Sequence, residues 1–326
     1  MIEDDGSIGT RRAEGTGSPQ AGDGPVNGEG AELDLSIIFP AYNEEAALGD
    51  DLDDTRRALE ATALRYEILV VDDGSRDATA DIAGARPWVR LIQHPYNRGN
   101  GAARTTGVRQ ARGRIVGFSD ADRTYPVDRI PEMMALVDAG ADMVIGARRV
   151  EAGTLKLLRT PAKWFIRKLA EFMTGTRIPD LNSGLRLQRR DVTLRFLPIL
   201  PSTHSWVSTI TIAFLSASFE VRWLPIDYYP RVGRSTFHPL RDTYNYLMLC
   251  VRTVMYFNPL KIFLPLALGL LALGTGKYLF YDILWRFNPD WGLPPMPGTT
   301  LALIVTGLQV LVIGLLADLI VRRTSL

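Results

Sequence analysis

The 326-residue chain has one cysteine, Cys250, and three histidines, so it offers few side chains for disulfides or soft metal ligands. A single cysteine excludes an internal disulfide framework and any zinc site built from cysteines. No charge of one sign dominates either, since 37 Lys and Arg stand against 36 Asp and Glu. A protein that holds nucleic acid through bulk charge needs a clear basic excess, and the composition therefore excludes that class.

Apolar residues are unevenly distributed along the chain. Residues 1–34 are polar and rich in Gly, Ser and acidic side chains, which predicts a disordered tail because too little apolar surface can be buried. They also lack the apolar core of a signal peptide. Two apolar runs, 262–284 and 299–321, each supply the roughly 20 residues that a membrane-spanning helix needs. These features exclude both a uniformly soluble globule and a many-helix transporter.

The two apolar runs are separated by a short connector rich in Pro and Gly, which predicts an antiparallel transmembrane hairpin. Lys261, Arg322 and Arg323 flank the ends nearest the rest of the chain, whereas the connector carries only Arg286. The positive-inside rule then places both chain ends in the cytoplasm. Residues 241–261 are expected to form an amphipathic helix at the membrane surface. Apolar hairpins of this kind could also pack together in a homo-oligomer.

Between residues 35 and 240, short apolar runs alternate with polar loops and helical stretches. Residues 35–48 and 67–83 each predict a strand, a turn and the start of a helix. Further strands are expected at 89–95, 114–122 and 141–149, with helices at 101–113 and 130–140, and a helix then a strand within 207–229. Residues 150–200 show a less regular, basic pattern. The alternation predicts an α/β domain with a mainly parallel sheet covered on both faces.

Polar residues cluster where the predicted strands end, and ligands bind beyond that edge in such sheets. Asp120 and Asp122 lie two apart, so their carboxylates point the same way and can hold a hard divalent cation. An Asp-x-Asp pair also occurs by chance on many solvated loops. Asp72 can accept from a nucleobase or from ribose hydroxyls, although its segment also fits a simple turn before a helix. The basic residues between 159 and 195 also fit a solvated face toward anionic lipid headgroups.

Six segments occur in the order and spacing of family 2 glycosyltransferases: PAYNEE, VVDDGSRD, NRGNG, SDADRTYP, GARR and DLNSGLRLQRRD. More narrowly, the chain resembles the polyprenyl-phosphate glycosyltransferases, such as dolichol-phosphate mannose synthase. Its layout is similar to the bacterial undecaprenyl-phosphate glucosyltransferases, which carry a two-helix anchor. The match spans about residues 35–323. The resemblance implies a GT-A catalytic domain over 35–240, a nucleotide-sugar donor, a polyprenyl-phosphate acceptor and Mg²⁺ or Mn²⁺.

The resemblance also implies roles for individual residues. Asp120 and Asp122 would hold the metal, with Arg148 as the third catalytic residue. The donor pocket would consist of Pro40, Tyr42, Glu44, Asp72, Ala121, Arg231 and Arg234. The acceptor would be bound by Lys163, Arg167, Ser183 and Arg186, and Asp180 begins the same D-x-x-S-G-x-R segment. Thr236 stands where relatives usually carry a lysine, and Arg234 is expected to replace that lysine.

These features favour an enzyme that transfers a sugar from a nucleotide-sugar donor, of the GDP-mannose or UDP-glucose type, to a polyprenyl phosphate. The transfer is expected to invert the anomeric configuration, and the product is expected to serve cell-envelope glycans or protein glycosylation. The second pKa of a phosphate monoester is about 6, so the acceptor is already ionised and needs no general base. Two alternatives stay open. One is a transferase of the same fold that acts on another lipid, such as diacylglycerol. The other is a non-catalytic, membrane-tethered nucleotide-binding regulator, against which the intact Asp120 and Asp122 argue.

Overall fold

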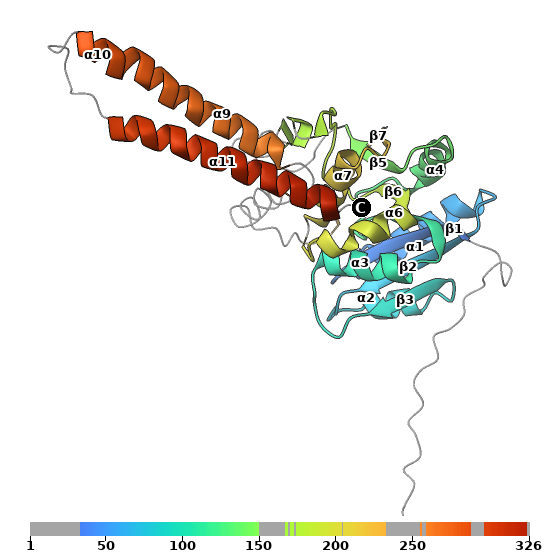
Figure 1. Ribbon diagram of the computed structural model, residues 1–326. Helices are drawn as coiled ribbons and strands as arrows, with labels where there is room; N and C mark the ends of the chain where they lie inside the picture. Colours follow the sequence, from blue (N-terminus) through green and yellow to red (C-terminus); the bar gives the residue numbers. More distant parts are fainter. Residues whose placement is uncertain are drawn as a thin grey trace, which may run out of the picture.

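The computed structural model describes residues 33–149, 167–168, 170–172, 174–203, 205–232, 255, 259–287 and 297–324. Within these ranges, seven strands form one sheet in the order β3-β2-β1-β4-β6-β5-β7 (Figure 1). Neighbouring strands are parallel except where β6 pairs antiparallel with β4 and β5. The structure confirms the predicted α/β fold with a mainly parallel sheet.

The strands are β1 (Leu33–Ala41), β2 (Tyr66–Asp72), β3 (Val89–Gln93), β4 (Gly113–Phe118), β5 (Met143–Arg148), β6 (Arg186–Arg189) and β7 (Val221–Ile226). The helices of the sheet domain are α1 (Leu48–Glu60), α2 (Thr79–Gly84), α3 (Asn100–Gln110), α4 (Ile130–Asp138), α6 (Arg190–Phe196) and α7 (Trp206–Ser216). Short 3₁₀ turns lie at Val127–Arg129 and Leu197–Ile199.

The sheet separates two apolar cores because side chains alternate between its faces along each strand. Leu35, Ile37 and Phe39 of β1 pack in the core that α1, α2 and α4 cover. Ile38 faces the other core, which α3, α6 and α7 cover and in which Trp206 is fully buried. With both faces covered, ligands have access only at the edges of the sheet, beyond the strand ends.

Where the structure describes residues 150–200, they contain more helix and strand than the sequence predicts. They include β6 and α6, and β6 lies in the middle of the sheet. The strand reads Arg-Leu-Gln-Arg, so it shows no apolar run, yet Arg186 and Gln188 are both fully buried. Arg186 pairs in register with Phe118 on β4 and with Ile145 on β5. A polar strand becomes possible here because Arg186 donates to buried oxygen atoms of Ser183, Val207 and Thr211, and Gln188 Nε2 donates to Thr193 Oγ1.

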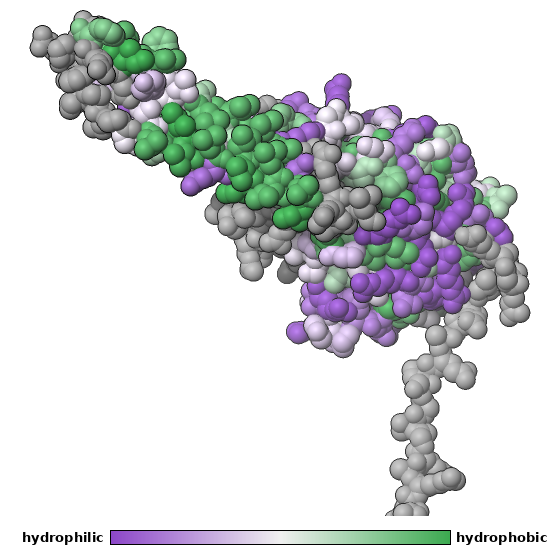
Figure 2. All heavy atoms as spheres, in the orientation of Figure 1, coloured by the Kyte–Doolittle hydropathy of each residue, from purple (hydrophilic) through white to green (hydrophobic). Residues whose placement is uncertain are grey.

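Two long apolar helices extend away from the sheet domain (Figures 1 and 2). The first consists of α9 (Leu260–Lys277), a π-helical stretch (Tyr278–Asp282) and α10 (Ile283–Phe287), and the second is α11 (Pro297–Thr324). Stretches of both, Leu260–Tyr281 and Gly298–Val321, are long and apolar enough to cross a membrane. The helices pack tightly, since a Cβ on Gly314 would lie 2.5 Å from Cβ of Phe263. Small residues allow such close approach between helices in lipid.

The base of this helical hairpin contacts the sheet domain through a small apolar cluster. Ala170, Ile178, Leu181 and Ile212 are buried in it, and Ile262 of α9 packs against them. Ile178 and Leu181 belong to the segment that leads into β6. The hairpin is therefore packed onto the chain segment that runs between β5 and β6.

An ion pair closes the same segment onto the end of β5. The Arg148 guanidinium donates to both carboxylate oxygens of Asp180, at 2.7 and 3.0 Å, and the Arg148 backbone N–H adds a third bond. Both side chains are largely buried, with exposures of 12% and 8%. Burial acts to raise the pKa of Asp180, but the hydrogen bonds and charge of Arg148 outweigh it and the pKa is lowered. Asp180 is therefore a charged, structural carboxylate at neutral pH.

We expect Asp180→Asn to lower the stability of the sheet domain, because the substitution removes the Asp180 counter-charge from the largely buried Arg148 guanidinium. Breaking a buried pair in this way costs about 3–5 kcal/mol. Because the pKa of Asp180 is lowered on folding, this stabilisation is present above the unfolded value of about 3.9 and is lost as pH falls through the folded value. Thermal melts of the full chain in detergent at pH 7 and at acid pH measure both effects. Equal melting temperatures at pH 7 would contradict this role.

Candidate active site

Three loops lie side by side at the carboxyl edge of the sheet because β2, β1 and β4 are parallel neighbours. The loops follow Ala41, Asp72 and Phe118, and they carry most of the predicted donor and metal residues. Pro40 and Ala121 are buried, and Tyr42 is half-buried beside them. The fold thus brings together segments that lie up to 80 residues apart in the chain.

The first two loops are bonded to each other reciprocally. The Asn43 N–H donates to Ser75 Oγ at 3.0 Å, and the Arg76 N–H donates back to Asn43 Oδ1 at 2.9 Å. The Glu44 N–H donates to Thr79 Oγ1 at 2.9 Å. Asn43 has φ of 55°, in the left-handed region that asparagine tolerates better than most residues. These bonds fix the loop that presents Glu44.

The two aspartates at the end of β2 have different partners. Asp72 is 2% exposed and accepts the Ser75 N–H at 3.1 Å. Asp73, to which sequence analysis assigns no role, accepts from His94 Nδ1 at 2.6 Å and from the backbone N–H groups of Arg98 and Gly99 at 2.9 and 2.7 Å. The structure thus gives both carboxylates a part in shaping the loops around the site.

The carboxylate of Asp122 is almost fully buried in the loop after β4. Its Oδ1 accepts from Thr124 Oγ1 at 2.5 Å and from the Thr124 N–H at 3.3 Å. Its Oδ2 lies 3.5 Å from Nε of Arg231, and its backbone carbonyl accepts the Val232 N–H at 3.1 Å. The loop after β7 is therefore bonded over the Asp-Ala-Asp segment, as the donor role predicted for Arg231 requires.

Arg231 links the first and third loops. Its guanidinium donates to Glu44 while Nε faces Asp122, so one cation lies between two carboxylates from separate strands. Burial raises the pKa of Glu44 to about 7, and although Arg231 opposes this rise, Asp122 and Asp120 add to it. Burial and the charge of Asp120 also raise the pKa of Asp122. Negative charge is thus concentrated here beyond what the side chains of the site neutralise.

Asp120 is more exposed than Asp122 and is held from two sides. Its Oδ1 accepts from Arg104 at 2.6 Å, and Arg104 comes from α3. On its other side lies Gly184, where a Cβ would be 2.4 Å from Asp120 Oδ2. Sequence analysis assigns no role to Arg104 or Gly184, because neither contact can be inferred from spacing along the chain.

A further buried carboxylate supports the turn that follows Asp122. Asp51 of α1 is 4% exposed and accepts the Arg123 N–H at 2.9 Å. Arg123 has φ of 60°, so its backbone is in the left-handed region. Burial raises the pKa of Asp51 to about 7. Sequence analysis also assigns no role to Asp51, since an aspartate in the first turn of a helix is unremarkable in a sequence.

The residues predicted for the acceptor lie in different surroundings. Ser183 is fully buried beside Gly184, and Arg167 is exposed. Arg186 is fully buried, and it donates to the carbonyls of Ser183 and Val207 and to Thr211 Oγ1. The Arg186 guanidinium is thus enclosed between the Ser183 turn and α7, and its part in acceptor binding stays a prediction. Lys163 and Arg234, and Thr236 with it, lie outside the described residues.

The donor set at Asp120 and Asp122 fits a hard divalent cation. Carboxylate oxygens are the ligands that Mg²⁺ and Mn²⁺ prefer, and Mg²⁺ is commonly held by one or two carboxylates together with substrate phosphates. Across the residues that the structure describes, no three His, Cys, Asp or Glu side chains are grouped as a metal site. Oxygen atoms of water and of a substrate would therefore complete the coordination of a cation bound here.

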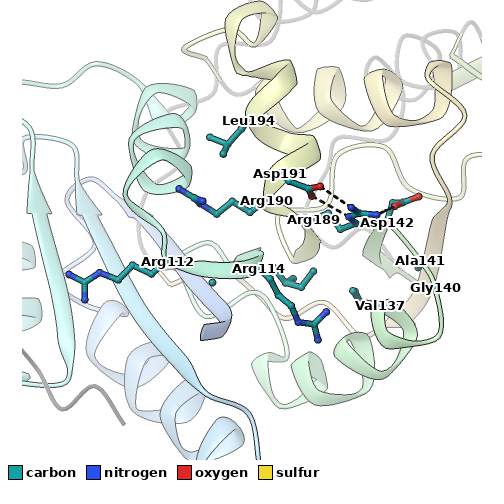
Figure 3. A pocket seen from close by; sticks show the side chains of 12 residues that line it. Arg112, Arg114, Val137, Gly140, Ala141, Asp142, Arg189, Arg190, Asp191 and Leu194 are labelled. Atoms are coloured by element: carbon teal, nitrogen blue, oxygen red, sulfur yellow. Dashed lines mark hydrogen bonds and ion pairs between the residues drawn. The ribbon is translucent and has the colours of Figure 1, made fainter. Parts of the chain in front are cut away.

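A cavity of about 560 Å³ lies at the opposite edge of the sheet (Figure 3). Arg112 and Arg114 line it at the start of β4, and Arg189 and Arg190 line it at the end of antiparallel β6. Arg189 is paired with Asp142 and Asp191, and Arg114 with Asp138. Its lining includes none of the predicted site residues that the structure describes. The carboxyl edge therefore remains the candidate active site.

Comparisons with known proteins show the family to which the chain belongs. Residues 36–196 match the model of glycosyl transferase family 2, and residues 258–322 match the GtrB C-terminal hairpin. The dodecaprenyl-phosphate galacturonate synthase of Rhizobium johnstonii is 27% identical over 305 residues, which covers 89% of this chain and 88% of that protein. The undecaprenyl-phosphate 4-deoxy-4-formamido-L-arabinose transferase of Shewanella sediminis is 30% identical over 298 residues, with coverage of 89% and 88%.

A solved structure shares the fold at low sequence identity. Glucosyl-3-phosphoglycerate synthase from Mycobacterium tuberculosis, in complex with Mn²⁺, UDP-glucose and phosphoglyceric acid, has a TM-score of 0.52 and 20% identity. The similarity covers 68% of this chain and 80% of that chain. The family matches and the relatives together confirm the resemblance that the sequence motifs indicate. The chain belongs to glycosyl transferase family 2 and is a glycosyltransferase with a C-terminal hairpin of the GtrB type.

Proposed function

We propose that this glycosyltransferase moves a sugar from a nucleotide-sugar donor to a polyprenyl phosphate at a membrane surface. The observation that carries the proposal is the path of residues 178–184. Ile178 and Leu181 pack with Ile262 at the base of the apolar hairpin, and Gly184 lies against Asp120. An acceptor whose lipid chain lies in the bilayer would therefore meet the donor site only a few residues from the hairpin. The names of the two relatives support a polyprenyl-phosphate acceptor.

The donor would bind at the loops after β1, β2 and β4. Pro40, Tyr42, Glu44, Asp72 and Ala121 would line the nucleotide pocket. Asp120 and Asp122 would hold Mg²⁺ or Mn²⁺ against the diphosphate, and the bound cation would neutralise the charge that develops on the leaving nucleoside diphosphate. The presence of Mn²⁺ and UDP-glucose in the solved structure of the same fold supports this assignment.

Arginines would supply the remaining positive charge around the diphosphate. Arg231 lies between Glu44 and Asp122, and its exposed fraction of 36% leaves it accessible to a bound phosphate. Arg234 follows in the same loop and would assist. Arg148 would act from the end of β5, where its bonds to Asp180 hold the guanidinium in place. Such preorganised charge stabilises the leaving group without reorganisation during the reaction.

The acceptor phosphate would be aligned behind the anomeric carbon by Lys163 and Arg167, with Ser183 beside the metal site. A phosphate monoester is already largely ionised at neutral pH, so no side chain has to remove a proton from it. Direct attack by one phosphate oxygen, with departure of the nucleoside diphosphate, inverts the anomeric configuration. The two cations would also reduce repulsion between the acceptor phosphate and the donor diphosphate.

The hairpin would anchor the enzyme in the membrane with both chain ends in the cytoplasm, as the positions of Lys261, Arg322, Arg323 and Arg286 indicate. Transfer assays with the full chain in detergent test the proposed reaction. UDP- and GDP-sugars would be offered with undecaprenyl phosphate or diacylglycerol, and the lipid products identified by mass spectrometry. A glycosylated lipid phosphate is expected. Sugar found on diacylglycerol alone would contradict the proposed acceptor.

We expect Asp122→Ala to abolish transfer, because the diphosphate leaving group would lose a ligand of its counter-ion. Nucleotide-sugar binding should weaken in Mn²⁺ and change little in EDTA, which calorimetry can measure. Asp138→Ala is the matched control, since Asp138 pairs with Arg114 at the far end of β4. Near-wild-type turnover by the Asp122 variant would contradict a metal-assisted mechanism.

Gly184→Ala tests the close approach of the backbone to Asp120. The added Cβ would lie 2.4 Å from Oδ2 and 2.8 Å from Cγ of Asp120, so the carboxylate would have to move. A displacement on the order of 1 Å at a catalytic group can reduce the rate by about 100-fold. We expect kcat to fall by about that factor with little change in melting temperature. Unchanged kcat would show that the Asp120 position is not critical.

Lys163→Ala and Arg167→Ala separate the acceptor role from the donor role. Each charge-assisted bond to phosphate is worth roughly 1.5–3 kcal/mol, which corresponds to about a ten- to a hundredfold loss in kcat/KM for polyprenyl phosphate. The Kd of the nucleotide sugar should stay almost unchanged, whereas Arg148→Ala should weaken donor binding first. Steady-state kinetics with both substrates varied measure the split. Loss of donor affinity in the Lys163 and Arg167 variants would reverse the assignment of the two substrates.

A further inference from the structure

Arg104 is a buried cation directly beneath the exposed carboxylate of Asp120. Its side chain is 2% exposed, whereas that of Asp120 is 33% exposed. One terminal nitrogen donates to Asp120 Oδ1 at 2.6 Å, and the guanidinium lies 5.1 Å from the centroid of the Phe118 ring. The cation is thus shielded from solvent while its partner faces the site.

A chain of bonds holds this guanidinium in a fixed orientation. Arg104 Nε donates to Asn100 Oδ1 at 2.7 Å, and Asn100 is the first residue of α3. The loop before Asn100 is held by Asp73, which accepts the N–H groups of Arg98 and Gly99. Asp73 is itself bonded to His94, whose Nε2 lies 2.9 Å from Thr106 Oγ1 on α3. The NRGNG motif is therefore part of a support that runs from the end of β2 to Asp120.

The second oxygen of Asp120 is confined by a different element. Oδ2 lies against the backbone at Gly184, so close that no side chain fits there. Tyr125 fixes this backbone, since its hydroxyl accepts the Gly184 N–H at 2.7 Å. Arg104 on one side and Gly184 on the other thus leave the carboxylate little freedom to rotate. The orientation of Asp120 is set by residues outside its own loop.

Local stability alone does not account for an arginine in this place. One terminal nitrogen of Arg104, Nη1, is buried and has no hydrogen-bond partner among the described atoms. A second buried cation, Arg186, is close enough that the charge of Arg104 contributes to lowering its pKa, although burial is the larger cause. A buried arginine that has one unbonded nitrogen and lies close to another cation lowers the stability of the fold. Its effect on Asp120 accounts for its presence despite this cost.

We propose that Arg104 is a positioning residue that fixes the rotation of the Asp120 carboxylate for binding of the divalent cation. The inference rests on the proposed function, because it takes Asp120 as a metal ligand. Residues that orient a metal ligand without touching the metal typically change metal affinity by about 10- to 100-fold when they are replaced. Arg104 does not contact either substrate in this assignment, and its loss acts through Asp120.

Binding of Mn²⁺ to the full chain in detergent, followed by electron paramagnetic resonance, provides a readout that does not depend on turnover. Titrations would be done in the presence of UDP and, separately, of GDP. Arg104→Gln is expected to raise the half-saturating Mn²⁺ concentration by about tenfold or more. Arg104→Lys should restore part of the affinity, since it retains the charge without the planar fork that bridges Asn100 and Asp120. The KM for polyprenyl phosphate should not change.

Two further variants make the result decisive. Asn100→Ala removes only the acceptor of Arg104 Nε and should shift Mn²⁺ binding in the same direction by a smaller factor, even if Arg104→Gln fails to fold. Arg114→Gln removes an arginine that also pairs with an aspartate, but at the other end of β4, and should leave Mn²⁺ binding unchanged.

The outcomes separate the inference from the function on which it rests. If Arg104→Gln and Asn100→Ala both bind Mn²⁺ at least as tightly as the wild-type chain, and only their melting temperatures fall, the positioning role is overturned. The proposed function stays intact in that case, because the wild-type chain still binds Mn²⁺. Should Arg104→Gln not fold, wild-type Mn²⁺ affinity in Asn100→Ala would overturn it as well. Absence of nucleotide-dependent Mn²⁺ binding in the wild-type chain would overturn the proposed metal chemistry itself, and the positioning role with it.

Discussion

The burial of several carboxylates close together at the end of the parallel strands is the constraint on which the site depends. Glu44 comes from the loop after β1, whereas Asp120 and Asp122 share the loop after β4. Burial together with their mutual charge raises the pKa of Glu44 and of Asp122. Bringing them together without compensation would be unfavourable. The fold supplies that compensation partly through Arg231 and Arg104. The divalent cation that we propose at Asp120 and Asp122 would add to it.

The loops can hold this arrangement because each is fixed by another loop and not by its own strand alone. Asn43 is bonded to the turn after β2, Asp73 holds the start of α3, and Asp51 of α1 holds the turn at Arg123. Each bond involves a backbone N–H of a loop residue, outside the hydrogen bonds of the helices and strands. Polar side chains thus position the backbone of the loops. That backbone in turn positions the side chains that we propose to act on the substrates.

Much of the fold could be predicted from the sequence, because apolar runs such as those of β1 and β2 are continuous and end at clear polar turns. β6 could not, since Arg186 and Gln188 make it polar and the burial of both depends on partners in α6 and α7. The Asp-Ala-Asp segment and Arg231 were predicted from motifs and lie together. Arg104, Asp51 and Gly184 could not be found in this way, because their contacts with the site join distant segments and leave no pattern of spacing. The burial of Arg186 could not be predicted for the same reason, because its motif indicates a site residue and its depth is a property of the packed sheet.

A single short segment connects the base of the apolar hairpin to the candidate active site. The segment from Ile178 to Gly184 touches the hairpin base at one end and Asp120 at the other, and Asp180 in its middle is bonded to Arg148. Trp223 of β7 adds a bond from its indole N–H to the Asp180 carbonyl at 3.0 Å. A short, tightly bonded segment of this kind has little freedom to lengthen, so the fold sets the distance between Asp120 and the base of the hairpin. An acceptor that is confined to the membrane surface requires such a fixed distance, whereas a freely diffusing acceptor does not.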